Sequence, residues 1–315
     1  MTRILYHNPC CDGFAAAFVA WLKLGVSATY HPVRYHEPLP AEVRDGDEVI
    51  ILDFSYSRET LEALAKRCKV LVLDHHPSAR QELDGLPFAR FEQDKCGCVM
   101  AWEHYFPGRP LPRALQYIDW RDRGVMFQAP ETVPADLPVF YAGLWLGTAR
   151  NFHAWKHALS CFDEQGTATL LKDMPDVENL EDQTSFYEEQ AVVFQRGGAI
   201  ATAQALAVQD RADEASWLSL DGHKVPAACS AADKSEIAAE LLRRHPEAPF
   251  AVVWSVRSST LVEVSLRSRK DGFDVGALAK QHGGGGHRCA AGFSNSLPLL
   301  ASALEGEIQT PAPQP

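Results

Sequence analysis

The amino-acid sequence predicts an α/β protein, and three observations support this prediction. Short apolar runs alternate with helical patterns through the first 110 residues, as they do in βαβ units. The runs are rich in Val, Ile and Leu and lack polar alternation, which is typical of parallel strands buried on both faces. The chain has 315 residues, about twice the usual ~150-residue domain, so two domains are expected.

The first domain is expected to alternate strands and helices. Residues 3–7 (RILYH) predict a strand, and residues 12–25 (DGFAAAFVAWLKLG) predict the helix that follows it. Residues 48–55 (EVIILDFS) predict a second strand, and residues 57–68 (SRETLEALAKRC) a second helix. A third apolar run at 69–76 (KVLVLDHH) completes a pattern that favours a parallel sheet with crossover helices.

The rest of the chain predicts a helical middle and a smaller second domain. Residues 137–205 are expected to be mainly helical, within which 185–208 connect the domains and break at the adjacent glycines 197 and 198. A helix at 235–245 and a hairpin within 250–269 predict a second α/β domain. We therefore assign residues 1–190 to the N-terminal domain, 191–205 to the connecting segment, 206–306 to the C-terminal domain and 307–315 to a disordered tail.

Composition limits the partners that this chain can have. Its 30 basic and 41 acidic side chains give a net charge of −11, which disfavours neutralising the many phosphates of long nucleic acid. Eight cysteines in a chain with no expected secretory leader predict reduced thiols and a cytoplasmic location. No stretch approaches the ~20 apolar residues of a membrane span, so no membrane is expected as a partner.

Metal-capable side chains follow three of the predicted strands. Binding groups of parallel sheets collect at the carboxyl ends of the strands, and imidazole and carboxylate together suit a divalent transition metal such as manganese. The segment YIDWRDRG at 117–124 supplies two further carboxylates. The candidates are His7, Cys10 and Asp12 after the first strand, Asp53 after the second, Asp74, His75 and His76 after the third, and Asp119 and Asp122.

Asp53 stands alone at its strand end and is the natural bridge of a two-metal site. Such sites hold metals about 3.5 to 4 Å apart, generate hydroxide and stabilise the leaving oxygen. The alternative is that Asp53 caps the next helix, although Ser57 could cap that helix without it.

A glycine run in the second domain predicts an anion-binding loop. In GGGGHRCAAGF at 283–293, the amides of Gly284, Gly285 and Gly286 could approach an anion closely, and His287 adds a donor. Arg267 and Arg269 of SLRSR fall on one face of a strand and could grip the same anion. The alternatives are a flexible glycine linker and a solvated edge strand.

These motifs, taken in order, resemble the DHH phosphoesterases that carry an associated C-terminal substrate-binding domain. YHNPCCDGFAAA is similar to the first family motif, ILDFS to the second, LDHH to the third and YIDWRDRG to the fourth. VSLRSR followed by GGGGHRCAAGF is similar to the signature of the associated domain. The resemblance covers nearly the whole chain and implies an active cleft between the two domains.

The resemblance implies a role for each matching residue. It implies two metal ions, most often manganese, with magnesium, cobalt or zinc as alternatives, and Asp53 shared between them. Asp74 would orient its neighbours, and His76 would donate to the scissile phosphate. Asp122, or less securely Asp119, matches the fourth-motif ligand. The implied metal ligands are His7, Asp12, Asp53, His75 and Asp122.

Cys10 departs from the family pattern, because it stands where the family often has a first aspartate. A thiolate is softer than a carboxylate, so one metal site could be weaker, select a different ion or lack this ligand. If Cys10 is not a ligand, it is a small packing residue.

The resemblance also narrows the function. Long-strand exonucleases of the family carry extra domains, its pyrophosphatases have a different C-terminal domain, and its membrane-bound cyclic dinucleotide hydrolases have membrane segments. We therefore predict a nanoRNase-like phosphodiesterase that acts on short oligonucleotides. Because members of the family often pair, the resemblance also implies a homodimer. The alternatives are a cyclic dinucleotide phosphodiesterase, an adenosine bisphosphate phosphatase, or a catalytically weak nucleotide-binding regulator.

Overall fold

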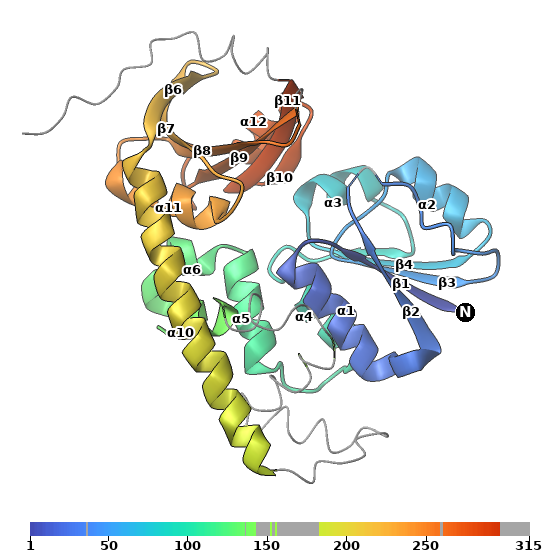
Figure 1. Cartoon of the computed structure of the whole chain (residues 1–315). Helices are drawn as coiled ribbons and strands as arrows, with labels where there is room; N and C mark the ends of the chain where they lie inside the picture. Colours follow the sequence, from blue (N-terminus) through green and yellow to red (C-terminus); the bar gives the residue numbers. More distant parts are fainter. Residues whose placement is uncertain are drawn as a thin grey trace, which may run out of the picture. The chain divides into compact units, whose positions relative to one another are not determined.

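The computed structural model describes residues 1–35, 37–135, 137–142, 152, 155, 183–258 and 261–296. The chain divides into two compact units, Met1–Ala201 and Thr202–Pro315, which we call the first and second unit. Each unit builds its own sheet (Figure 1). The predicted tail at 307–315, and most of the helical middle predicted between 143 and 182, lie outside the described residues.

The first unit contains a five-stranded parallel sheet with the order β2-β1-β3-β4-β5. This confirms the predicted α/β class and the N-terminal parallel sheet. The chain leaves β1 in one direction to form β2 and then builds the other strands in the opposite direction, so the order reverses between β1 and β3. In such sheets, ligands bind outside the carboxyl ends of the strands at this reversal. The strands are β1 (Thr2–His7), β2 (Ala28–Val33), β3 (Glu48–Leu52), β4 (Lys69–Asp74) and β5 (Ala89–Phe91).

Helices cover both faces of this sheet because its strands are apolar on both sides. Ile50 and Leu52 of β3 pack in one core, whereas Val49 and Ile51 pack in the other, as the two-residue period of a strand requires. On the first face lie α1 (Cys11–Leu24), α4 (Gly97–Tyr105) and α5 (Arg113–Asp122). On the second lie α2 (Arg58–Ala65) and α3 (Pro77–Leu83), and the unit also contains η1 (Gly25–Ser27), α6 (Val125–Gln128), η2 (Pro130–Thr132) and α7 (Leu137–Tyr141).

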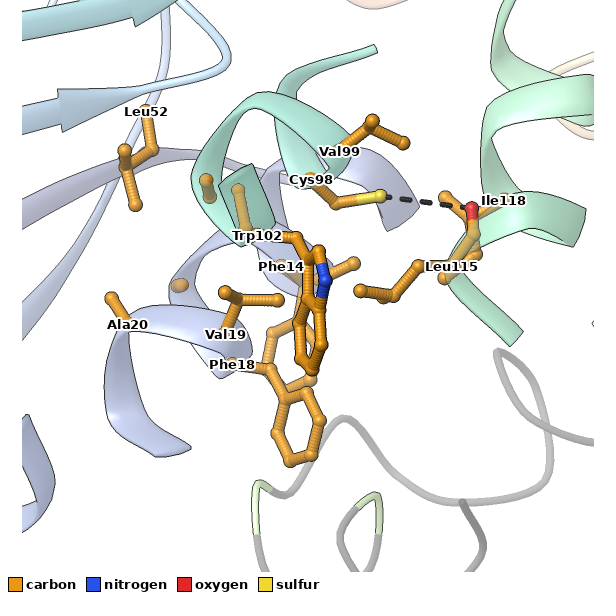
Figure 2. Packing of buried hydrophobic residues seen from close by; sticks show 14 of the residues in the cluster. Phe14, Phe18, Val19, Ala20, Leu52, Cys98, Val99, Trp102, Leu115 and Ile118 are labelled. Carbon is orange, nitrogen blue, oxygen red and sulfur yellow. Dashed lines mark hydrogen bonds between the residues drawn. The ribbon is translucent and has the colours of Figure 1, made fainter. Parts of the chain in front are cut away.

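An aromatic core fixes the helices of the first face against one another. Figure 2 shows Phe14 and Phe18 of α1 beside Trp102 of α4, with Leu115 of α5 close by. Full burial of a large apolar side chain of this kind stabilises a fold by roughly 1.5 to 3 kcal/mol. Because α1 and α4 begin close to the metal-capable residues, this core holds both helix N-termini in place.

The second unit contains a six-stranded mixed sheet with the order β10-β11-β9-β8-β7-β6. β7 and β8 pair in parallel, and the other neighbouring strands pair antiparallel, including the predicted β8–β9 hairpin. Helix α12 covers one face, while α11 and the C-terminal part of α10 cover the other. Helix α10 (Gln183–Asp213) begins in the first unit and ends in the second. The other elements of the second unit are β6 (Ser216–Leu220), β7 (His223–Cys229), α11 (Lys234–Arg244), β8 (Phe250–Val256), β9 (Leu261–Ser268), α12 (Val275–Gln281), β10 (Gly285–His287) and β11 (Ala290–Ser296).

The expected break at Gly197 and Gly198 is wrong, because α10 runs through both residues as one 31-residue helix. A glycine inside a helix costs only about 1 kcal/mol relative to alanine, which a long helix tolerates. Within the part of the chain that the structure describes, no helix is both long and apolar enough to cross a membrane.

Candidate metal and phosphate site

The ends of β1, β3 and β4 bring three of the predicted ligands together. The side chain of Asp53 lies between two imidazoles: its Oδ2 is 3.5 Å from His7 Nδ1, and its Oδ1 is 3.2 Å from His75 Nε2. Asp53 is 1% exposed. Each oxygen of one buried carboxylate therefore faces a different histidine, which is the arrangement expected of a ligand shared between two ions.

Two groups of possible ligand atoms flank this carboxylate. In the first, one atom each of His7, Cys10 and Asp53 lie within 4.8 Å of one another. In the second, the same holds for Asp12, His75 and Asp122. His75 Nε2 is 3.4 Å from Asp122 Oδ2 and 3.7 Å from Asp12 Oδ2. All six predicted metal ligands thus lie in one of these two groups.

Asp53 adopts a left-handed backbone conformation, with φ of 62°. Non-glycine residues rarely do so, although aspartate tolerates this region better than most. Its amide donates to the Leu73 carbonyl, at 2.9 Å, so the end of β4 holds this turn. Strain of roughly 1 to 3 kcal/mol is typical of such residues and is concentrated at functional sites.

Two glycines let the ligands approach one another, and only one of them lies in a predicted motif. Asp12 accepts hydrogen bonds from the amides of Gly97 (2.6 Å) and Cys98 (2.8 Å) at the start of α4. A Cβ on Gly97 would lie 2.6 Å from Asp53 Cβ and 3.0 Å from Asp12 Oδ2. A Cβ on Gly13 would lie 2.3 Å from the His7 carbonyl oxygen. Gly97 was missed because it lies outside the motifs that sequence reasoning singled out.

The charges of this cluster are not balanced by the residues around it. Burial, followed by the charges of Asp53 and Asp122, raises the pKa of Asp12 well above its usual value. Burial alone would raise the pKa of Asp53, but His7 and His75 outweigh it and hold that pKa well below the ordinary value. Burial lowers the pKa of His75, yet Asp53, Asp122 and Asp12 overcome it and raise the pKa to about 10. Three carboxylates, of which Asp12 and Asp53 are buried, therefore compete for too little positive charge.

Asp74 orients the two histidines that follow it. Its Oδ1 accepts hydrogen bonds from the amides of His75 (2.7 Å) and His76 (3.1 Å) and lies 2.7 Å from His76 Nδ1. Its Oδ2 accepts a hydrogen bond from Ser55 Oγ, at 2.6 Å. Burial favours protonation of Asp74, but the charge of His76 and its hydrogen bonds from His76 and Ser55 lower its pKa. Because Asp74 is ionised, His76 Nδ1 is the donor of the hydrogen bond between them. Ser55 holds Asp74 in place and is therefore a positioning residue that sequence reasoning missed.

The structure separates the two candidate carboxylates of α5. Asp119 accepts hydrogen bonds from Arg123 at 2.9 and 2.7 Å and from the Cys96 amide at 2.9 Å. Asp122 lies beside His75 instead. Asp122 is therefore the member of the ligand cluster, and Asp119 fixes the end of α5 and the start of α4.

The glycine run of the second unit is an ordered strand and turn rather than a linker. The amides of Gly283 and Gly284 donate to the carbonyls of Lys280 and Ala279, at 3.1 and 2.8 Å. A Cβ on Gly284 would lie 2.1 Å from the Gly292 carbonyl oxygen, so β10 packs too closely on β11 for a side chain there. The amide of Gly284 is already used, and only Gly285, Gly286 and His287 of the predicted anion loop remain candidates.

The two arginines of SLRSR have different surroundings. Arg269 lies beyond the end of β9 and donates to the carbonyls of Leu242, His245 and Ala248, at 2.7 to 3.0 Å. Arg267 lies on the face of β9 that carries α11, where its guanidinium donates to Ser235 Oγ at 2.9 Å. Arg269 therefore ties α11 and the following loop to the sheet, and we retain Arg267 as the anion-binding candidate.

Comparison with known families identifies the second unit. Residues 227–309 match the DHHA1 domain. The second unit therefore contains a DHHA1 domain, the associated domain that the sequence motifs predict. The N-terminal parallel sheet with a separate C-terminal sheet domain also matches the fold of a solved protein from Vibrio cholerae, described as the pGpG-specific phosphodiesterase PggH. That structure is 14% identical and has a TM-score of 0.50, and the match covers 96% of both chains.

Two further proteins are similar to this chain. "Uncharacterized protein R106" of Acanthamoeba polyphaga mimivirus is 28% identical over 312 residues, which cover 93% of this chain and 67% of that protein. A solved exopolyphosphatase-related protein from Bacteroides fragilis is 10% identical with a TM-score of 0.46, and the match covers 93% of this chain and 86% of that one.

The ligand cluster of the first unit fits divalent cations. Among the described residues, neither oxygen of Asp53 accepts a hydrogen bond, although both are buried. Buried polar atoms without such partners are rare and costly, unless an ion or water completes them. Cations coordinated by the two ligand groups would satisfy both oxygens and offset the excess negative charge.

Proposed function

We propose that this protein is a DHH phosphoesterase, and that it is a manganese-dependent phosphodiesterase that hydrolyses short oligonucleotides. The observation that supports it most is the placement of Asp53 between His7 and His75, with a separate group of ligand atoms on either side. Two divalent cations held by these residues would supply an activated water molecule and stabilise charge on the leaving oxygen.

The choice of manganese follows from the chemistry of the donors. His7 and Asp53 on one side, and Asp12, His75 and Asp122 on the other, combine imidazole with carboxylate, which suits manganese better than the all-oxygen shell that magnesium prefers. Cys10 adds a sulfur to the first group, and magnesium, cobalt and zinc are the competing ions. A thiol at this position would make the first site softer than the second.

His76 is proposed to contact the scissile phosphate. Asp74 accepts the Nδ1 hydrogen of His76, so Nε2 is the nitrogen left to face a substrate. Burial lowers the pKa of His76, but the charge and hydrogen bond of Asp74 outweigh it and raise the pKa. A protonated His76 would donate a hydrogen bond from Nε2 to a phosphate oxygen, where charge builds up during the displacement.

The second unit is proposed to bind the far end of the substrate through Arg267, His287 and the amides of Gly285 and Gly286. A fixed anchor favours substrates of two to about five nucleotides, because a long strand gains no further contacts and meets a chain with net charge −11. The similar Vibrio cholerae protein is named for pGpG, a linear dinucleotide, which supports testing dinucleotides first.

A substrate panel tests this proposal. Purified protein is incubated with manganese or magnesium and with single strands from dinucleotide to 24-mer, as RNA and DNA, beside cyclic dinucleotides and adenosine bisphosphate. We expect the dinucleotide to have the highest kcat/KM, and activity to fall steeply beyond about five nucleotides. Preference for a cyclic dinucleotide or for the bisphosphate would replace the proposed substrate, and nucleotide binding without turnover would favour a regulatory protein.

Two further experiments test the remaining expectations. Fractionation of cells would test the predicted cytoplasmic location, and light scattering would test the predicted homodimer.

A further inference from the structure

Tyr35 is an exposed aromatic residue beside the ligand cluster, and none of the assignments above uses it. It lies two residues beyond the end of β2 and is 46% exposed. Its ring centroid is 4.7 Å from that of His7 and 6.3 Å from that of His76. A large aromatic side chain thus reaches solvent between a proposed metal ligand and the proposed phosphate donor.

Ring contacts hold Tyr35 in this position. Its contacts with His7, His76 and the buried Phe54 are all of the edge type, with ring planes 66° to 87° apart. Edge contacts fix the orientation of a ring without covering both of its faces.

We propose that Tyr35 is a nucleobase-binding residue, whose ring stacks on the base next to the scissile phosphate. The inference rests on the proposed function, because it assumes that the phosphate of a nucleotide lies beside His7 and His76. A base is one sugar away from that phosphate, and an ordered aromatic face at the rim of the site is the feature that single-stranded nucleic-acid sites use to hold it. Stacking tolerates every base, so Tyr35 provides preference for nucleotides over other phosphodiesters without selecting a sequence.

The test compares Tyr35→Leu and Tyr35→Phe on two substrates with manganese held constant. One substrate is a linear dinucleotide, and the other is the same sugar-phosphate without its two bases. Tyr35→Leu should raise KM for the dinucleotide about 5- to 150-fold, which corresponds to ~1 to 3 kcal/mol for one stacked base, with kcat nearly unchanged. Tyr35→Phe keeps the ring and should behave like the natural protein, and neither variant should change turnover of the baseless substrate.

Each alternative role of Tyr35 predicts a different result. An equal loss for Tyr35→Phe and Tyr35→Leu would assign the effect to the hydroxyl and overturn the stacking proposal. An equal loss of kcat/KM on the baseless substrate would also overturn it. Weaker binding of manganese to Tyr35→Leu in the absence of substrate would do the same, because Tyr35 would then merely support His7. Tyr56→Leu is the matched control, since Tyr56 packs on Phe54 at 5.0 Å and donates to the Pro38 carbonyl.

The proposed function can fail separately from this inference. If the natural protein hydrolyses neither substrate, the phosphodiesterase proposal is wrong. The dissociation constant of the intact dinucleotide then still tests Tyr35: weaker binding by Tyr35→Leu and unchanged binding by Tyr35→Phe would support stacking, and equal affinities would overturn it.

Discussion

The two units differ in how well their charged side chains are paired within each unit. In the first unit, Asp12, Asp53 and Asp122 gather around His75 and His7. Burial, followed by repulsion between the carboxylates, raises the pKa of Asp12 and that of Asp122. In the second unit, Glu263 pairs with Lys234 at 3.1 Å and with Arg257 at 2.8 Å. The carboxylates of the first cluster therefore lack sufficient cationic partners among the described residues, whereas Glu263 in the second unit is balanced by two basic side chains.

Both units use glycine to allow close approach, but for different purposes. Gly97 brings the start of α4 against the side chains of Asp53 and Asp12, whereas Gly284 brings β10 against the backbone of β11. Close packing therefore fixes ligand geometry in the first unit and strand pairing in the second. Substitutions at the close contacts of the first unit should alter metal binding and catalysis. Substitutions at those of the second unit should alter substrate affinity or stability.

The largest effect is expected for Asp53→Asn. Asparagine tolerates the left-handed backbone of this position, but it removes the charge that two cations would share. Even residues that merely orient metal ligands contribute about 10- to 100-fold, so manganese-dependent kcat/KM should fall by more than ~100-fold. Steady-state kinetics measure this loss. Thermal unfolding without metal should show a lower unfolding temperature, because the variant also removes the negative charge that faces His7 and His75.

Asp47→Asn is the control for that variant. Asp47 is a buried carboxylate near the opposite end of β3 and pairs with Arg3 at 2.9 Å. This change should lower the unfolding temperature and leave the manganese-dependent rate of the folded protein intact. Retention of most activity by Asp53→Asn would contradict the shared-ligand assignment.

Arg267→Ala tests the second unit. A charged hydrogen bond to phosphate contributes about 1.5 to 3 kcal/mol, or roughly 10- to 150-fold in binding. We expect kcat/KM on a dinucleotide to fall by this factor, mostly through a higher KM. The kcat/KM on a minimal phosphodiester such as bis-p-nitrophenyl phosphate should change little. His287→Ala should follow the same pattern, while Arg269→Ala should lower stability without changing KM. Equal losses on both substrates would place Arg267 in the catalytic centre.

Gly97→Ala tests the close packing around the ligands. The added methyl group would force Asp53 and Asp12 apart, so manganese affinity should weaken about 10- to 100-fold, as for other residues that orient metal ligands. Isothermal titration with manganese measures the change. Gly198→Ala is the control, because a Cβ there meets no neighbour within 4 Å and should favour the helix by up to about 1 kcal/mol. Unchanged manganese affinity in Gly97→Ala would show that the ligand geometry does not depend on this contact.

The smallest effect is expected at Cys10. If its sulfur is a ligand, Cys10→Asp should shift the ranking of activating ions toward manganese and magnesium and away from zinc, by less than about tenfold in activity. Cys10→Ala should weaken one site while the other keeps its affinity. Activity profiles over manganese, magnesium, cobalt and zinc would show these shifts, and identical profiles in both variants would assign Cys10 to packing.

The sequence predicted the strand ends of the site well, because a buried parallel strand leaves a plain apolar run before His7, Asp53 and Asp74. β2 was missed, since its six residues contain a proline, a threonine and a histidine and therefore form no apolar run. β5 was missed because it has only three residues. Gly97, Ser55 and Tyr35 were also missed. Each acts through a contact between segments far apart in the chain, and no periodic pattern records such a contact. For the same reason, the sequence left Asp119 and Asp122 unresolved until their partners were known.

The number of manganese ions bound by the first unit tests the central claim most directly. Metal-free protein would be titrated with manganese and followed by electron paramagnetic resonance, which distinguishes isolated ions from magnetically coupled pairs. We predict two ions per chain, coupled in the natural protein, and loss of the coupled signal in Asp53→Asn but not in Asp47→Asn. Binding of a single uncoupled ion, or a coupled signal that survives in Asp53→Asn, would contradict the two-metal site around Asp53.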